Sequence, residues 1–378
     1  MIRLTSRERW LRMFRGKDID RYPIWLLFPW HRLNCYANVY EIECYKPIVK
    51  RISCGDCDSL DRRGINTGFC FNANPDIVLQ TRTYQSGRNI VSETILNAPG
   101  CELKKSISRG DDNTTVKYFV DDPQKLKDIL SIPYVAPRPD LDIIKKERIE
   151  FGDKGLFMLD IGDPLAPLYH LMSATDFSMA TATDYELLLE FLDVLSDRVL
   201  EVYKYTLENE VADCYFIVGS EFAGPPLVSP AKFNELSVRY VKKIVNMIRK
   251  YGKLSIVHYH GNLSRVFDGM REINPDGLHT IEAPPIGDCS IVQAREALDD
   301  IALIGNIQYD DLIRLNVEQI REQVRDVMRQ ARTQIEGVLS PAKFVLSPTA
   351  GPYEEFIDER AVENYLAMID AGLEFGSF

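Results

Sequence analysis

The sequence lacks a long apolar segment. Its longest apolar runs, such as residues 24–30 and 216–218, are far shorter than the roughly 20 residues that a transmembrane helix needs. The opening residues, MIRLTSRE, also lack the apolar core of a signal peptide. We therefore expect a cytoplasmic protein that does not insert into a membrane.

Positive charge is also in short supply. Lys and Arg number 45 and Asp and Glu number 56 among 378 residues, which gives a formal net charge of −11. Binding to phosphate backbones requires clustered basic side chains that outnumber the nearby acids. The balance argues against a general nucleic-acid surface and leaves a small molecule as the expected substrate. The hypothesis for the assembly of the chain is a homodimer.

The eight cysteines do not form a disulfide pattern. In a chain without an export signal they are more typical of free thiols than of disulfides. Cys54 and Cys57 have the C-x-x-C spacing of metal and redox sites, but no second pair follows them. The sequence alone assigns this pair no role.

Short apolar runs alternate with helical patterns after residue 150, as in parallel α/β proteins. The runs predict strands at residues 155–159, 214–218, 254–257, 277–281, 301–305 and 344–346. Two further strands are predicted near the N-terminus, at residues 23–28 and 76–79. Eight strands interleaved with helices predict an α/β fold, a (β/α)8 TIM barrel that forms a single domain over residues 1–378.

Residues 88–120 have a different pattern of apolar and polar residues. Alternating β-type segments at residues 89–96, 101–107 and 114–120 are separated by turn residues. This pattern predicts a β-meander inserted between the second and third strands of the barrel.

Two histidines mark the end of the predicted strand at residues 254–257. Successive side chains of a strand point to opposite faces, so His258 and His260 would share a face at the strand end where α/β folds bind ligands. Glu282 follows the next strand, and two imidazoles with a carboxylate suit Zn²⁺, Fe²⁺ or Ni²⁺. The alternative is that His258 is a core histidine bonded to a carbonyl. We expect His279 and Tyr259 to face the surrounding helices.

Other polar residues follow the remaining strands, and we expect all of them to line one pocket. They are Asp160, Asp163, Ser220, Glu221, Asn306, Gln308, Ser347 and Thr349. Two carboxylates around one substrate are a sensible acid/base arrangement, and Asp160 and Glu221 are the candidates. Asn306 would orient a polar group, and Asp163, Ser220, Gln308 and Ser347 would contact substrate. The structural alternatives are a helix cap for Asp160 and a turn for Asp163.

Several short motifs together resemble the uroporphyrinogen decarboxylase superfamily in their order along nearly the whole chain. They are RERW (7–10) with PIW (23–25), GSEFAGP (219–225) with SP (229–230), HYHGN (258–262), GNI (305–307) and LSP (346–348). The resemblance implies a (β/α)8 barrel, in agreement with the strand count. It also implies one of two chemistries: decarboxylation of uroporphyrinogen, or methyl transfer between a corrinoid and a thiol or pteridine acceptor.

The resemblance to the decarboxylase is incomplete at its functional positions. Arg32 is the only member of the family's arginine pair, because Phe28 stands at the first position. Glu221 replaces the serine of the family motif, and Ala350 replaces the late histidine. Tyr169 corresponds to the family tyrosine with an offset of one position. A substrate with many carboxylates needs arginines, so these departures argue against it.

The resemblance to the thiol methyltransferases is also partial. His260 stands where their H-x-C motif has cysteine, and Ala350 stands at the second cysteine, which argues against a thiolate zinc. The inserted meander nevertheless resembles the methyltransferase branch. Glu282 is similar in spacing to a zinc-ligating glutamate of the cobalamin-independent methionine synthases.

The resemblance therefore favours a corrinoid-linked methyltransferase that acts on a small substrate. It implies a corrinoid, carried by a partner protein, and a divalent metal such as Zn²⁺ at His258, His260 and Glu282. Uroporphyrinogen decarboxylation is the alternative activity. A non-catalytic protein that binds a corrinoid or tetrapyrrole is the alternative from another class.

Overall fold

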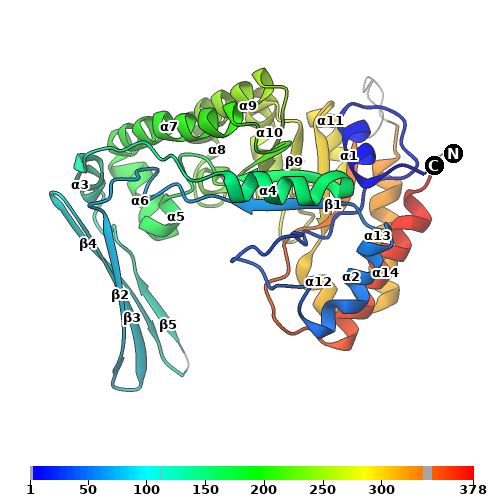
Figure 1. The fold of residues 1–378 in the computed structure, drawn as a ribbon, viewed down its shortest axis with the longest axis horizontal. Coiled ribbons are helices and arrows are strands. Elements are labelled where there is room, and N and C mark those ends of the chain that lie inside the picture. The colour runs from blue at the N-terminus through cyan, green and yellow to red at the C-terminus, as the bar shows by residue number, and fades with distance from the viewer. Residues whose placement is uncertain (1–2, 112, 335–342) are drawn as a thin grey trace.

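The chain folds into two β-sheets and a set of helices (Figure 1). The structure, a computed structural model, describes residues 3–111, 113–334 and 343–378. Within these residues, a seven-stranded parallel sheet has the order β1-β6-β7-β8-β9-β10-β11, and a four-stranded antiparallel sheet has the order β2-β3-β4-β5. The parallel strands are β1 (Ser59–Gly64), β6 (Gly155–Asp160), β7 (Cys214–Ile217), β8 (Leu254–His258), β9 (Gly277–His279), β10 (Ala302–Ile307) and β11 (Phe344–Pro348).

The six C-terminal strands that the sequence predicts are confirmed, each within a few residues of its expected bounds. The two N-terminal predictions are wrong in detail. Residues 23–28 form no regular strand, and residues 76–79 belong to no parallel strand because β2 begins at Val78 in the other sheet. The seventh parallel strand is β1, in a region for which no element was predicted from the sequence. The expected eight-stranded barrel is therefore corrected to a curved sheet of seven regular strands.

The segment around Trp25 lies between the two edge strands of this sheet. Its backbone N–H donates to the Leu346 carbonyl of β11 at 2.9 Å, and Ile24 forms an isolated parallel bridge to the same residue. On the other side, the Asp58 N–H donates to the Ile24 carbonyl at 2.6 Å, directly before β1. The Leu346 N–H also donates to the Pro23 carbonyl at 3.0 Å, so the N-terminal segment connects β11 with β1 through a few hydrogen bonds instead of a full ladder.

Asp58 fixes this connection with its side chain. Its carboxylate is fully buried, accepts the Ile24 N–H at 3.0 Å, and is paired with the guanidinium groups of Arg9 and Arg21. Buried carboxylates are tolerated when charge and hydrogen bonds are both satisfied. The ion pairs therefore tie the first helix and the connecting segment to the start of β1.

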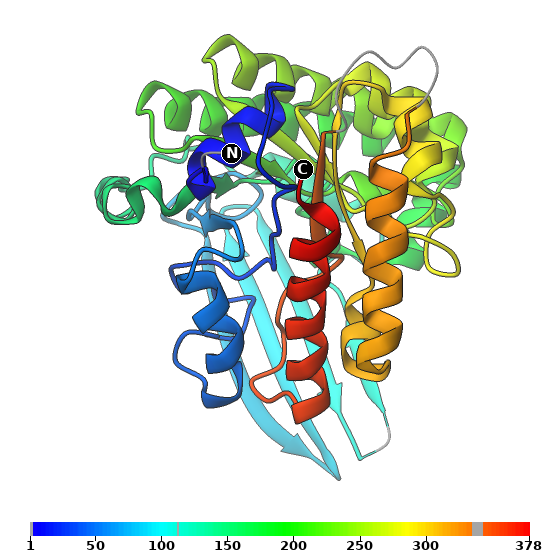
Figure 2. The same cartoon turned by 90° about the vertical axis from the view of Figure 1, so that its right-hand side faces the viewer.

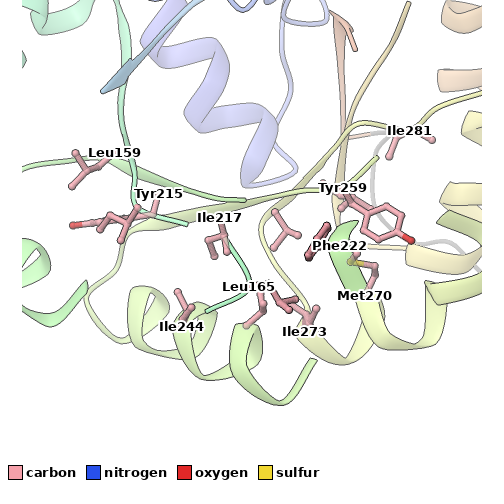
Figure 3. Packing of buried hydrophobic residues seen from close by; sticks show 14 of the residues in the cluster. Leu159, Leu165, Tyr215, Ile217, Phe222, Ile244, Tyr259, Met270, Ile273 and Ile281 are labelled. Atoms are coloured by element: carbon pink, nitrogen blue, oxygen red, sulfur yellow. The ribbon is translucent and has the colours of Figure 1, made fainter. Parts of the chain in front are cut away.

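The parallel sheet separates two hydrophobic clusters. The inner cluster is formed by alternate strand residues such as Leu60, Met158 and Ile304, and helix α1 (Ser6–Phe14) contributes Trp10. A larger outer cluster lies between the sheet and the helices. Figure 3 shows side chains of this outer cluster, among them Ile217 from β7. Each buried side chain of this size contributes about 1.5–3 kcal/mol.

Helices cover the outer face of the sheet, and α13 and α14 lie side by side in Figure 2. The α-helices are α1 (Ser6–Phe14), α2 (Lys46–Ser53), α3 (Lys125–Ser131), α4 (Asp142–Phe151), α5 (Leu168–Leu171), α6 (Ala174–Thr183), α7 (Tyr185–Glu208), α8 (Pro230–Phe233), α9 (Arg239–Lys250), α10 (Phe267–Ile273), α11 (Ile291–Leu298), α12 (Tyr309–Arg314), α13 (Val317–Ala331) and α14 (Glu359–Gly376). Among the described residues, none of these helices has the length and apolar character needed to cross a membrane.

The antiparallel sheet is an arm that projects from the rest of the molecule in Figure 1. Its strands are β2 (Val78–Ser86), β3 (Asn89–Ala98), β4 (Cys101–Arg109) and β5 (Thr114–Lys117). The predicted meander at 88–120 is confirmed as an antiparallel insertion, but it begins ten residues earlier and includes β2 as a further strand. The arm enters the chain between β1 and β6. Three residues at the base of the arm are buried, Leu96, Cys101 and Leu103. Strand β2, in contrast, is exposed along its whole length.

Candidate functional site

A layer of polar side chains lies at the carboxyl ends of the parallel strands. Alternation along each strand places these side chains on the face that carries the inner cluster. Ile256 belongs to that cluster, so His258 follows it on the same face, and Ile304 is related to Asn306 in the same way. The apolar interior thus ends in polar groups where ligands bind in parallel α/β proteins.

His258 and His279 form the centre of this layer. Their Nδ1 atoms lie 2.9 Å apart and their rings are stacked with centroids separated by 5.0 Å. His279 is fully buried, and its Nε2 lies 3.3 Å from the Pro348 carbonyl oxygen. The expectation that His279 faces the helices is therefore wrong, whereas Tyr259 does pack in the outer cluster against Phe233.

Burial keeps both imidazoles neutral. Desolvation, reinforced by the neighbouring His260, lowers the pKa of His279 to about 3 and holds the pKa of His258 well below its ordinary value. His258 therefore offers a neutral ring to a ligand near pH 7.

His260 and Glu282 form an ion pair beside this centre. The Nδ1 of His260 lies 3.0 Å from Glu282 Oε1, and the other carboxylate oxygen accepts the Gly261 N–H at 2.8 Å. Burial raises the pKa of Glu282, but these hydrogen bonds outweigh it and hold that pKa below its ordinary value. The His260 ring is perpendicular to that of His258, with centroids 4.5 Å apart.

The predicted metal ligands His258, His260 and Glu282 do lie together, as the sequence indicated. Both Glu282 oxygens are already engaged, and the Nδ1 of each histidine already has a partner. Among the described residues, no group of three or more His, Cys, Asp or Glu side chains is arranged to hold a metal. In this arrangement the three side chains do not fit a shared metal ion, and the metal site stays a prediction from the sequence.

Arg62 is a member of this layer that the sequence did not indicate. It lies on β1, its Nε donates to Asp160 at 2.9 Å, and its Nη1 donates to the Tyr36 hydroxyl at 2.7 Å. Its guanidinium lies over the Phe216 ring at 4.6 Å. Because Asp160 belongs to the neighbouring strand β6, the pair joins two strand ends, and the carboxylate does not cap a helix.

Glu221 lies on the loop after β7 and is nearly buried. Burial raises the pKa of its carboxyl group, and the Gly219 N–H at 3.1 Å and nearby His260 oppose this effect. The Tyr169 hydroxyl hydrogen-bonds to Glu221, and the Tyr169 ring packs on Phe222 with centroids 4.4 Å apart. A buried carboxyl group with a raised pKa is a candidate for proton transfer.

Asp163 and Ser220 are fully buried and bond to each other at 3.1 Å. Asp163 also accepts N–H groups of its own loop, from Leu165 at 2.8 Å and Ala166 at 3.2 Å. Ser237 donates to Ser220 at 3.0 Å. Desolvation and the nearby Glu221 raise the pKa of Asp163 to about 8. These contacts favour the turn that was the structural alternative for Asp163.

Asn306 presents an unused amide oxygen at the end of β10. The buried Asn306 Oδ1 has no hydrogen-bond partner within the described part of the chain, whereas the Gln308 side chain hydrogen-bonds to Glu282. Thr349 donates to Gln308 Oε1 at 3.1 Å, and the fully buried Ser347 hydroxyl donates to the neighbouring Pro348 carbonyl. A buried amide group without a hydrogen-bond partner costs about 1–3 kcal/mol of free energy, and a ligand group that bonds to it would recover this cost.

Arg32 is not brought to this layer by any contact that the described residues show. Its side chain is exposed, and only its backbone oxygen is engaged, by Arg63. Cys54 and Cys57 are free thiols, the first exposed and the second buried. Arg62, which the sequence analysis did not indicate, is the arginine of this layer, and alternation along a charged strand is the signal that could have identified it.

A separate cavity of about 840 Å³ lies outside β1, between residues 63–79 and 137–144. Its walls include Arg63 and Arg138, but its asparagines are engaged, since Asn72 and Asn74 both donate to the Pro133 carbonyl. Because Arg62 and Arg63 point to opposite faces of β1, this cavity is distinct from the polar layer.

Comparisons with known proteins support the same fold. The family described as uroporphyrinogen decarboxylase (URO-D) matches residues 96–371. Among solved structures, the chain is similar to a methyltransferase from Methanosarcina mazei, with a TM-score of 0.61 and 16% sequence identity over 98% of this chain and 99% of that one. At this identity the likeness shows the fold alone. Among curated protein sequences, nothing matches the chain.

Proposed function

The chain belongs to the uroporphyrinogen decarboxylase family, and from this we propose that it is an enzyme of the methyltransferase branch. In this proposal it transfers a methyl group between a small substrate and a corrinoid carried by a partner protein. The name of the Methanosarcina neighbour suggests this choice over the decarboxylase, whereas the fold is compatible with both chemistries. The corrinoid would supply or receive the methyl group.

The observation that carries the proposal is the charge balance of the polar layer. Arg62 is its arginine, and that guanidinium is already paired with Asp160. Glu221 and Glu282 add two further carboxylates to this layer. His260 interacts electrostatically with both of them. A porphyrinogen with several carboxylate arms needs free guanidinium groups to bind it, whereas a small neutral or cationic substrate does not.

Glu221 is the residue that we assign to proton transfer. When a methyl group bonds to an acceptor atom that carries hydrogen, that proton must leave. The raised pKa makes the Glu221 carboxylate a stronger base, and Tyr169 orients that carboxylate through a hydrogen bond. Asn306, with its unpaired amide oxygen, would orient a donor group of the substrate.

The test is a methyl-transfer assay with purified protein, methylcobalamin as donor and a panel of thiols and amines as acceptors. Loss of the methyl–cobalt absorbance at the rate of product formation supports the proposal. The Glu221→Gln variant should lose activity by about 100-fold, the usual effect of removing a general base. Glu363→Gln, on an exposed position of α14, is the matched control and should retain activity.

The same preparation is tested with uroporphyrinogen. Conversion of uroporphyrinogen to coproporphyrinogen without methyl transfer would refute the proposal and show that the enzyme is a decarboxylase. A spectral shift of added cobalamin without turnover on any acceptor would instead indicate a non-catalytic binding protein.

A further inference from the structure

The ring nitrogens of the two central histidines can be assigned from the chemistry of their partners. His279 Nε2 lies 3.3 Å from the Pro348 carbonyl oxygen, in a fully buried position. A carbonyl oxygen only accepts hydrogen bonds, so the proton of His279 is on Nε2. The Nδ1 of this neutral ring therefore carries a lone pair.

The lone pair on His279 determines the tautomer of His258. The two Nδ1 atoms are 2.9 Å apart, and one proton must lie between them. Since His279 Nδ1 has none, His258 Nδ1 donates, and the lone pair of His258 is on Nε2.

The surroundings hold the pair in this orientation. Phe216 packs against both rings, at centroid distances of 5.2 Å for His258 and 6.1 Å for His279. Trp25 contacts the His279 ring from the inner cluster at 5.6 Å. His258 itself is only partly buried, its ring also hydrogen-bonds to the His279 backbone, and no side-chain hydrogen bond to its Nε2 is found among the described residues. Its Nε2 is therefore the atom of the pair that is free to meet a ligand.

We infer that His279 is a positioning residue. It holds the His258 ring so that the Nε2 lone pair of His258 is directed at the substrate. The substrate group at this position is then a hydrogen-bond donor, an O–H, N–H or S–H. This inference rests on the proposed function for the identity of the ligand as a methyl acceptor, but the tautomer does not depend on it. His260 differs because its Nδ1 partner is a carboxylate, which also stabilises the doubly protonated ring.

Nitrogen NMR of protein labelled with ¹⁵N-histidine tests the assignment directly, because the chain has five histidines to resolve. We expect His258 to show a protonated Nδ1 and an unprotonated Nε2, and His279 to show the reverse. A His258 whose lone pair is on Nδ1 would overturn the inference, whatever the enzyme assay shows.

Two substitutions at His279 separate positioning from folding. His279→Leu removes the acceptor, and we expect the tautomer preference of His258 to be lost and kcat to fall about tenfold with little change in KM. His279→Asn returns an acceptor oxygen near the former Nδ1 and should restore both readouts. Equal thermal stability of the two variants removes misfolding as the cause.

The two proposals fail differently. A His279→Leu variant with an unchanged His258 spectrum and unchanged kcat would exclude the positioning role while leaving methyl transfer intact. The expected nitrogen spectrum without methyl transfer to any acceptor would confirm the tautomer and reject the proposed function.

Discussion

Breaking the pair between Arg62 and Asp160 gives a quantitative test of the polar layer. The Arg62→Met variant keeps most of the aliphatic volume and removes the guanidinium. It deletes the ion pair, the hydrogen bond to Tyr36 and the contact with the Phe216 ring. It also leaves the Asp160 carboxylate without its cation.

The expected loss can be worked from the geometry. Two unit charges about 4 Å apart attract by about 4 kcal/mol at an effective dielectric constant of about 20. The side chains of Arg62 and Asp160 are 14% and 22% exposed, so water screens part of this attraction. We expect a coupling energy of about 2 kcal/mol. The Arg62→Met variant alone should lose about 3–5 kcal/mol of unfolding free energy because it strands a partly buried carboxylate.

A double-mutant cycle with Asp160→Asn measures the coupling energy. Urea unfolding of the native chain, both single variants and the double variant gives it as the departure from additivity. Arg32→Met is the matched control, because that arginine is exposed, and its effect should stay within about 0.5 kcal/mol. Additive single losses, or an equal loss for Arg32→Met, would refute the placement of Arg62 in the interior.

Further predictions concern pH, metal content and packing. The pKa of Asp213 is lowered to about 2, since hydrogen bonds from Arg7 outweigh burial, so its contribution to stability is present above pH about 4 and lost as the pH falls towards 2. Asp213→Asn should therefore cost about 2 kcal/mol at pH 7 and little at pH 2, which acid unfolding monitored by circular dichroism would show. Methyl transfer should decline as the pH falls through the raised pKa of Glu221, and the residual activity of Glu221→Gln should lack this limb; an identical pH–rate profile would exclude Glu221 as the base. Elemental analysis of untagged protein should find well under one metal per chain, because no group of three or more His, Cys, Asp or Glu side chains among the described residues is arranged to hold an ion, and a stoichiometric metal would contradict that arrangement. Gly224→Ala should destabilise the protein by about 1–3 kcal/mol, because its Cβ would lie 2.0 Å from the Tyr259 hydroxyl, and an unchanged Tm would show that the loop relaxes freely.

The sequence predicted the six apolar strands of the C-terminal part, whereas two apolar runs near the N-terminus proved misleading and the charged strand β1 was missed. β1 reads SLDRRG, a composition that is typical of loops. It is a strand because each charged side chain has its own partner: Asp61 pairs with His31, Arg62 with Asp160, and Arg63 with Glu147. These partners come from distant parts of the chain, and local pattern cannot indicate them.

The candidate site was predicted in part for a similar reason. The shared face of His258 and His260 followed from alternation, and their proximity to Glu282 followed from neighbouring strands. His279 was assigned to the wrong face because the register of a short strand is ambiguous by one residue. Gly277 decides it: a side chain there would meet Phe14 and Ile304 of the inner cluster, so His279, two residues later, points inward as well.

The arm has a consequence for the order of folding. β1 pairs with β6 from Ser59↔Gly155 onward, and the whole arm lies between these strands in the chain. Hairpins close within about 1–10 μs, whereas pairing of distant parallel strands is slow because a long loop must be closed first. Early formation of the arm brings the ends of that loop nearer to each other. We expect the folded arm to shorten the flexible connection between β1 and β6 before the parallel sheet assembles.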